Sequence, residues 1–283
     1  MVEERFRLTV AECGSPEGNL GAVRRAAEAG VRVFLAAGGD GTVNALLNAL
    51  LASGGTRPFR DLALGAIGLG SSNDFHKPGG ATLGTWPCRI DVAHARPRDV
   101  GLATVTDSGG GTFRRAFFVS ASLGVTAEAN AFFNGGDAVM RGLKRRWTAG
   151  AIAYAALRTI LRHRNLGGAL SVDGASERVP ITNLSVLKTP YLSGGLRFDT
   201  PAFPDDGLFA VNLCAGMGPC GAVRALVDLA HGRFAGRPYC RHWRSPRVVV
   251  GMDREAVLEL DGEVTVASRV SFEIGPERIP VCA

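Results

Sequence analysis

The chain has 283 residues, a net charge of +6, an apolar content of 46% and 20% charged residues, which is the balance of a folded globular protein. The positive charge comes mostly from arginine and suits an anionic partner such as a nucleotide or an acidic lipid surface. The sequence contains no zinc-finger, basic-zipper or aromatic RNA-binding pattern, so a nucleic-acid partner is not expected. The six cysteines are scattered and form no CxxC pair, which predicts reduced thiols in a cytoplasmic protein. The first residues are charged and no apolar segment follows them, so a signal peptide is not expected.

The first third of the chain alternates strand-like and helix-like segments. In chain order these are a strand (Phe6–Val10), a helix (Asn19–Ala29), a strand, glycine turn and helix (Val31–Leu51), and a second buried strand (Leu62–Leu69). The second buried strand ends in a polar loop, Gly70–Phe75, and Gly38 and Gly68 lie 30 positions apart, the length of one βαβ crossover. Parallel strands joined in this way place both loops at one edge of the sheet, where open α/β sheets bind ligands.

The glycine turn Gly38-Gly39-Asp40-Gly41-Thr42 is the first candidate site. Its glycines allow consecutive N–H groups to converge, and Thr42 is placed to cap a helix whose N-terminus adds partial positive charge. This pattern predicts a phosphate ligand. Asp40 would repel phosphate unless a divalent cation lies between them, as in a magnesium nucleoside triphosphate. The alternative is an ordinary βα turn with a solvated Asp40.

From about Asp99 the pattern changes to short strands separated by Gly, Pro, Asp and Ser. They are Val100–Val105, Phe113–Ser122, Leu170–Val172, Val179–Val186, Leu208–Cys214, Arg247–Val250 and Ala256–Leu260. This density predicts an antiparallel sandwich or barrel, interrupted by helices at Val139–His163 and Gly221–Gly232. Basic Arg141–Trp147 precedes apolar Ala149–Leu161, which indicates either contact with an anionic membrane surface or a core helix with solvated arginines.

Four motifs occur in an order that matches one family. They are GGDGT at 38–42 with Asn44 behind it, NDF at 73–75, DDGLF at 205–209 and DGE at 261–263. With them the chain resembles the bacterial diacylglycerol kinase and lipid kinase family, relatives of sphingosine and ceramide kinases. The resemblance implies a Rossmann-like, NAD kinase-like α/β nucleotide domain over residues 1–98, completed by 272–283, and a β-sandwich lipid-binding domain over 99–271. It also implies transfer of the ATP γ-phosphoryl group to a lipid hydroxyl, with Mg²⁺, at the cytoplasmic face of a membrane.

The resemblance also implies roles for single residues. Nucleotide would be held by Gly38, Gly39, Asp40, Gly41, Thr42, Asn44 and Ser71, the last standing where the family usually has threonine. Glu263 matches the catalytic base, and Asp99 looks like the aspartate that works with it. Asp206 matches the aspartate of a magnesium site, with backbone ligands expected at Phe203 and Leu208. A carboxylate beside a second carboxylate has a raised pKa, which suits a base near neutral pH.

Two departures from the family pattern keep other functions open. The family usually has an earlier strand with an Asn-Pro loop, which has no counterpart upstream of the first glycine turn, and Ala45 stands where the family commonly has glutamate. A non-catalytic nucleotide- or lipid-binding homologue is therefore one alternative. An NAD kinase-like enzyme, which shares GGDGT, is another. The sequence does not name the lipid, and it leaves a homodimer open.

Overall fold

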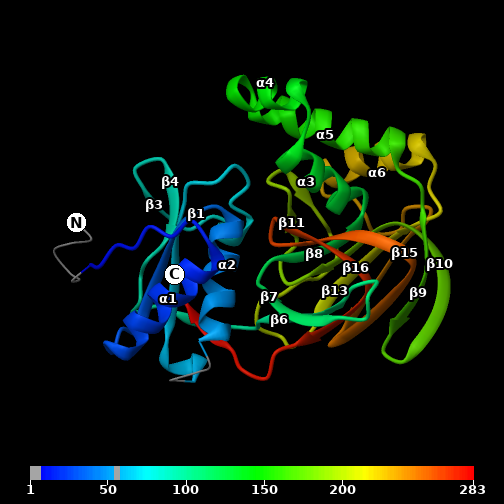
Figure 1. Cartoon of the computed structure of the whole chain (residues 1–283). Coiled ribbons are helices and arrows are strands. Elements are labelled where there is room, and N and C mark those ends of the chain that lie inside the picture. Colours follow the sequence, from blue (N-terminus) through cyan, green and yellow to red (C-terminus); the bar gives the residue numbers. More distant parts are fainter. Residues whose placement is uncertain (1–7, 54–57) are drawn as a thin grey trace.

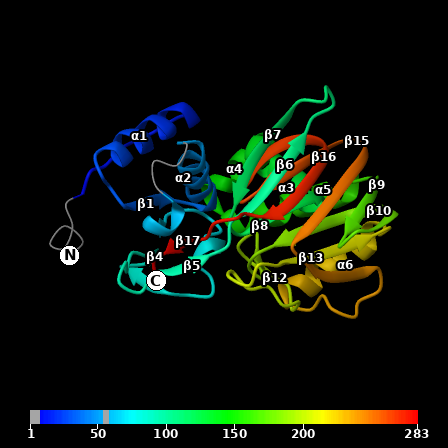
Figure 2. The ribbon, with the colours of Figure 1, turned by 90° about the horizontal axis from the view of Figure 1, so that it is seen from below.

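Two sheets lie side by side in the computed structural model, which describes residues 8–53 and 58–283 (Figure 1). The chain crosses from the first sheet to the second between residues 98 and 101. It returns between residues 274 and 279, so that the last strand joins the first sheet (Figure 2). The two halves of the molecule are thus joined by two short segments of chain.

The first sheet is built around β2 (Ala63–Gly68), which pairs with strands from distant parts of the chain. Its other members are β1 (Val33–Gly38), β3 (Ala81–Leu83), β4 (Trp86–Arg89), β5 (Arg96–Arg98) and β17 (Ile279–Val281). Strands β1 and β17 run parallel to β2, whereas β4 is antiparallel to it. The apolar side chains of β2 are almost wholly buried, as expected for a central strand.

Strands β1 and β2 form the βαβ unit that the sequence predicts. Gly38 pairs with Gly68 in register, so the two strands end together at one edge of the sheet. Helix α2 (Asp40–Ala52) follows β1 directly and packs on α1 (Pro16–Glu28), and short helical turns occur at η1 (Phe59–Asp61) and η2 (Asp74–His76). The predicted placement of both loops at one edge of the sheet is therefore confirmed.

The second sheet is antiparallel throughout and curls into a sandwich. Its strands are β6 (Gly101–Thr106), β7 (Thr112–Phe117), β8 (Ser120–Gly124), β9 (Leu166–Val172), β10 (Ala175–Leu187), β13 (Phe209–Ala215), β14 (Cys240–Ser245), β15 (Arg247–Leu260) and β16 (Glu263–Ile274). The long strands β10 and β15 each pair with β8 over one part of their length and with β9 over another. They thereby link two layers whose inward side chains form the largest apolar core of the molecule.

Four helices lie at one end of this sandwich, α3 (Val125–Gly135), α4 (Ala138–Arg146), α5 (Thr148–Arg162) and α6 (Pro219–Ala230), and α4 projects from the body of the molecule (Figure 1). The predicted single helix Val139–His163 is instead two helices, because Trp147 has extended backbone angles between them. Helix α3 and strands β14 and β16 were not predicted. A small hairpin, β11 (Tyr191–Leu192) and β12 (Leu196–Arg197), lies between β10 and β13 in the sequence.

Two other features bear on the sequence predictions. Leu8–Val10, the described part of the predicted first strand, is not in a strand, and Phe6 and Arg7 lie outside the described residues. No helix in the described ranges combines the length and apolar character that a membrane crossing would require.

Candidate active site

The two predicted glycine loops touch each other at the edge of the first sheet. The Leu69 amide donates to the Gly38 carbonyl at 2.9 Å. A Cβ atom on Gly70 would lie 2.4 Å from the Cα atom of Gly39, closer than any real side chain can come. Glycine is therefore required here by the close approach of two backbones.

Asp40 fastens these two loops together. Its Oδ2 atom accepts a hydrogen bond from the Asp74 amide at 3.0 Å, and its Oδ1 atom accepts one from the Phe75 amide at 2.8 Å. Burial raises the pKa of Asp40, and the amide of Phe75 opposes this effect. Both carboxylate oxygens thus hold backbone amides. The sequence expectation was different, with Asp40 facing a cation beside phosphate.

Helix α2 begins at Asp40 with Gly39 as its N-cap, and no side chain in the described part of the chain caps it. The prediction that Thr42 caps the helix is wrong, because Thr42 lies inside the first turn, where its own amide bonds to the Gly39 carbonyl at 3.0 Å. The first amides of a helix lack intrahelical partners, so this uncapped end offers N–H groups to an anion.

The DGE turn connects the second half to these loops through Asp261. The Asp261 carboxylate accepts hydrogen bonds from the backbone amides of Phe118, Val119 and Ser120 at 2.7–2.9 Å, and from the Asn44 side chain at 3.1 Å. Burial raises the pKa of Asp261 to about 6, although these donors favour the charged form. These hydrogen bonds of Asp261 therefore fix the position of the turn that carries Glu263.

Glu263 lies directly over the first turn of α2. A Cβ atom on Gly41 would be 2.6 Å from the Glu263 Oε1 atom, so a side chain at position 41 would displace this carboxylate. Glu263 itself is exposed, unlike Asp261 two residues before it. The first glycine turn and the predicted base thus meet across the junction between the halves.

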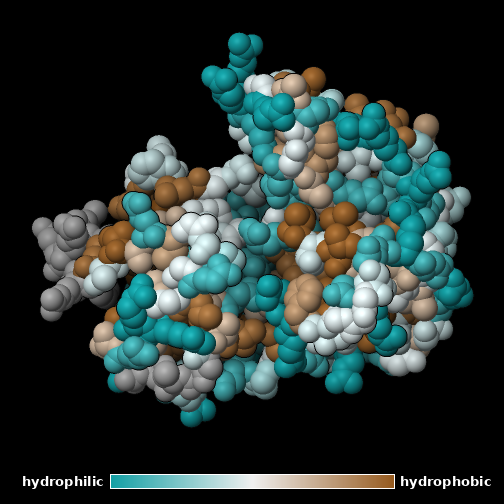
Figure 3. Space-filling view, in the orientation of Figure 1, coloured by the Kyte–Doolittle hydropathy of each residue, from teal (hydrophilic) through white to brown (hydrophobic). Residues whose placement is uncertain are grey.

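A cavity of about 720 Å³ extends from this meeting point into the second half. Its polar end includes the predicted site residues Gly39, Asp40, Gly41, Ser71 and Glu263 together with Asp74, Glu259 and Asp261. Its other walls are mostly apolar and come from α3, α5, α6, β13 and the turn between β13 and α6, with Ile152, Ala156, Met217 and Leu226 among them. In the space-filling view, hydrophobic residues gather on the second half beside the hollow between the halves (Figure 3).

A third loop closes the polar end. Asp74 accepts hydrogen bonds from the Gly194 amide, at 2.9 Å to Oδ2, and from Lys77 Nζ, at 2.7 Å to Oδ1. Lys77 also donates to the Gly194 carbonyl. The hairpin β11–β12, which carries Gly194, is thus fixed against the second glycine loop.

Glu259 is a functional candidate that sequence reasoning missed. It is 4% exposed and lines the cavity, and its Oε2 atom has no hydrogen-bond partner among the described residues. Burial raises the pKa of Glu259 to about 8, even though the Gly262 amide donates to its Oε1 atom. The side chain is therefore a neutral carboxylic acid near pH 7 and can donate a hydrogen bond. A single glutamate within an alternating strand gives no sequence signal of this kind.

Several predicted site residues do not line the cavity. Gly38 and Thr42 are not among the residues that line it. They pack closely on each other, since a Cβ atom on Gly38 would lie 2.2 Å from Thr42 Oγ1. Asn44 is buried and donates to the Ala116 carbonyl at 2.8 Å as well as to Asp261, so it joins α2 to the second half. Asp99 is also buried and is not among the cavity residues. The structure therefore does not bring Asp99 to Glu263.

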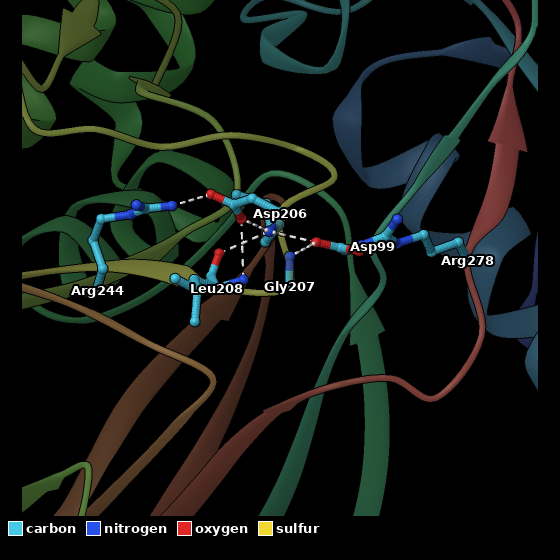
Figure 4. A network of polar contacts seen from close by, with 7 residues as sticks. Asp99, Asp206, Gly207, Leu208, Arg244 and Arg278 are labelled. Atoms are coloured by element: carbon cyan, nitrogen blue, oxygen red, sulfur yellow. Dashed lines mark hydrogen bonds and ion pairs between the residues drawn. The ribbon is translucent and has the colours of Figure 1, made fainter.

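The predicted magnesium ligands surround a lysine. Lys188 Nζ donates to Asp99 at 2.8 Å, to Asp206 at 3.0 Å and to the Leu208 carbonyl at 2.7 Å. Figure 4 shows Asp99, Asp206 and Leu208 turned toward one another at this point. The centroid of the Phe203 ring lies 5.4 Å from the guanidinium carbon of Arg244, and the expected role of the Phe203 carbonyl stays a prediction. These residues therefore do not fit a metal ion, and the described part of the chain contains no cluster of three His, Cys, Asp or Glu side chains that could hold one.

Known protein families match both halves of the chain. The diacylglycerol kinase catalytic domain model matches residues 1–103, and the YegS C-terminal NAD kinase beta sandwich-like domain model matches residues 120–283. A "Probable lipid kinase YegS-like" protein of Chromohalobacter salexigens is 28% identical over 244 residues, which are 85% of this chain and 72% of that protein.

Two crystal structures of Bacillus anthracis proteins have a similar fold. One has a TM-score of 0.68 at 20% identity, over 95% of this chain and 84% of that chain. The other, a diacylglycerol kinase, has a TM-score of 0.62 at 18% identity, over 95% and 82% of the two chains. At such identities the likeness concerns the fold alone. With the family matches, it confirms the predicted α/β domain and β-sandwich domain.

Proposed function

The chain belongs to the bacterial diacylglycerol kinase and lipid kinase family, and from this we propose that it transfers the γ-phosphoryl group of ATP to a hydroxyl group of a diacylglycerol-like lipid. Family membership supports a phosphotransferase that uses ATP, whereas the lipid acceptor is our proposal. The observation that carries it is one cavity in which an uncapped helix end and the Glu263 carboxylate lie next to apolar walls.

The polar end of the cavity suits the triphosphate. The amides of the first turn of α2 and the adjoining loop at Ser71 can donate to phosphate oxygens, and the partial positive charge of the helix end favours them. Mg²⁺ enters with ATP as part of the substrate and neutralises phosphate charge. Asp40 keeps the two glycine loops in contact, so its role in the proposal is to position backbone donors.

Glu263 suits the role of general base. In the proposed step the lipid hydroxyl gives its proton to the Glu263 carboxylate, its oxygen attacks the γ-phosphorus, and ADP leaves. The absence of a side chain at Gly41 lets this carboxylate lie next to the helix end where the γ-phosphate is expected. Asp261 holds the turn through its amide hydrogen bonds, so that Glu263 does not have to be ordered when substrate binds.

The apolar walls suit acyl chains. They are contributed by small and branched side chains of α5 and α6, which leave an open groove. On its other side, α5 exposes Leu157 and Leu161, and Trp147 between α4 and α5 is 65% exposed. The last turn of α4 adds Lys144, Arg145 and Arg146. We propose that this projecting pair of helices rests on an anionic membrane, because basic side chains beside exposed tryptophan and leucine favour that surface.

Lipid phosphorylation by the Glu263→Gln variant tests the proposed reaction. With radiolabelled ATP, Mg²⁺ and mixed micelles of diacylglycerol, we expect the variant to lose 10²- to 10⁴-fold in kcat, as is common when a general base is removed. Its ATP affinity by calorimetry and its thermal midpoint should match those of the wild type, since Glu263 is exposed. The matched control is Glu255→Gln, an exposed carboxylate outside the cavity, which should keep full activity.

Two outcomes would contradict the proposal at different points. Unchanged turnover in Glu263→Gln would remove that residue from the base role. A wild-type chain that neither binds ATP nor phosphorylates any component of a lipid extract would instead be a non-catalytic homologue. Phosphorylation of NAD in place of lipid would identify the NAD kinase-like alternative.

A further inference from the structure

Lys188 is a wholly buried lysine at the end of β10. Its backbone amide donates to the Val119 carbonyl at 2.9 Å, which continues the pairing of β10 with β8 and fixes where the side chain starts. Its side chain is 0% exposed, and its ammonium group meets three oxygen atoms at 2.7–3.0 Å. An ammonium group has three N–H donors, so each donor has an acceptor.

The three acceptors are oxygen atoms of the types that commonly coordinate a divalent cation. Two are carboxylate oxygens, from Asp99 and Asp206, and the third is the carbonyl oxygen of Leu208. Mg²⁺ and Ca²⁺ prefer such hard oxygen ligands. The separations from Lys188 Nζ are those of charged hydrogen bonds, so the space at the centre of the set is filled by the ammonium group.

The negative charge of this set is already more than offset by cationic side chains. Asp99 accepts from Arg278 Nε at 2.7 Å on its second oxygen, and the second oxygen of Asp206 accepts from Arg244 (Figure 4). Two carboxylates are thus surrounded by three cationic side chains. A divalent ion added here would meet net positive charge and would have to displace Lys188, which is unfavourable.

The cluster also lies where the two halves are joined. Asp99 belongs to the segment that enters the second half, and its amide donates to the Pro204 carbonyl at 2.8 Å. Arg278 belongs to the segment that returns to the first sheet. The Asp99 carboxylate binds the Gly207 amide at 2.7 Å. Lys188 therefore holds both crossing segments and the loop before β13 in one network.

From this arrangement we propose that Lys188 replaces the structural divalent cation expected from the sequence, so that the junction between the halves is held by an internal ammonium group and binds no metal. Mg²⁺ then acts only with the nucleotide. This inference does not depend on the lipid kinase reaction, because its test measures stability and metal binding without nucleotide.

The first measurement is made on the wild-type chain without ATP. Its thermal midpoint should be the same in EDTA as in millimolar MgCl₂ or CaCl₂ at matched ionic strength, and Mn²⁺ titration followed by electron paramagnetic resonance should show no site that depends on Asp206. Nucleotide-free Mn²⁺ binding that disappears in Asp206→Asn would overturn the proposal.

The second measurement compares two substitutions at Lys188. Lys188→Ala removes the cation that the two carboxylates share and leaves an open space between them, so its midpoint in EDTA should fall by on the order of 10 °C, and CaCl₂ or MgCl₂ should recover a large part of that loss. Lys188→Met removes the same charge but fills the space with a side chain of similar length, so its loss should not be recovered.

Two further outcomes complete this test. Asp206→Asn added to Lys188→Ala should abolish the recovery, because the cation then loses a ligand. The proposal that the ammonium group occupies a cation site would be wrong if no divalent cation stabilised Lys188→Ala. It would also be wrong if that variant yielded no folded protein even with MgCl₂ or CaCl₂ present. None of these results would change with the identity of the phosphoryl acceptor.

Discussion

At the scale of single residues, the buried side chain of Glu259 makes the stability of the protein depend on pH. Its pKa is raised from 4.5 to about 8, chiefly by desolvation, with Asp261 adding to the shift. Between these two values the unfolded chain loses the proton while the folded chain keeps it. Stability therefore falls as the pH rises from about 4.5 to about 8, because the folded state binds more protons.

We expect Glu259→Gln to remove this dependence. The amide keeps an acceptor for Gly262 and has no charge, so the variant should match the wild type near pH 5 and exceed it by a few kcal/mol near pH 8. Thermal unfolding across this range measures the difference. Parallel curves for the two proteins would show that Glu259 does not cause the pH dependence.

The site residues divide into those that the sequence could predict and those it could not. Gly39, Gly41 and Glu263 belong to motifs whose chemistry is local, and the structure brings them into one cavity. Asp99 was interpreted without its partners, and Lys188 gave no signal in the sequence. Asp99 was assigned to catalysis by motif alone, whereas its contacts with Lys188 and Arg278 come from segments 89 and 179 residues away. Such long-range pairing carries no local pattern.

At the scale of elements, the contact between the two glycine loops determines how the phosphate end of the cavity is shaped. A side chain on Gly70 would collide with the backbone of Gly39, so the loops would have to separate. We expect Gly70→Ala to cost about 1–3 kcal/mol in stability and to weaken ATP binding, because the amides of both loops would move. Chemical denaturation and calorimetric titration measure the two effects.

Gly79→Ala is the matched control for this substitution, since a Cβ atom on Gly79 meets no atom within 4 Å. It should change neither stability nor ATP affinity by more than a small amount. If Gly70→Ala behaved like this control, the close approach of the loops would not matter for the nucleotide. A loss of stability with unchanged affinity would place the bound phosphates elsewhere.

The elements themselves were predictable where periodicity was strong. The strand, turn and helix around Gly38 follow from an apolar run, glycines and an amphipathic pattern, and their pairing follows from spacing. The break at Trp147 was missed because apolar residues continue at helical spacing through it, so only its extended backbone reveals two helices. Strand β16 was missed because its inner face is set by pairing with β15 and β6.

At the scale of the whole molecule, the apolar walls of the cavity and the basic end of α4 lie on the same half, which bears on the proposed membrane contact. Helix α5 faces the cavity with Ile152 and Ala156, and it presents Leu157 and Leu161 outward. In Figure 3 hydrophilic residues cover the projecting tip over α4, and hydrophobic residues appear along the upper edge behind it. A lipid drawn from the membrane at this edge would reach the apolar walls before the polar end.

We therefore expect the double variant Arg145→Ala and Arg146→Ala to bind vesicles of anionic phospholipid at least about tenfold more weakly, since each basic side chain near such a surface contributes about 1 kcal/mol. The double variant Arg24→Ala and Arg25→Ala on α1 removes the same charge from the other half and should keep wild-type binding. Vesicle sedimentation at low and high salt measures both, and the difference should shrink as salt screens the charges. Equal losses in the two variants would mean that net charge alone attracts the chain, and they would remove α4 as the docking surface.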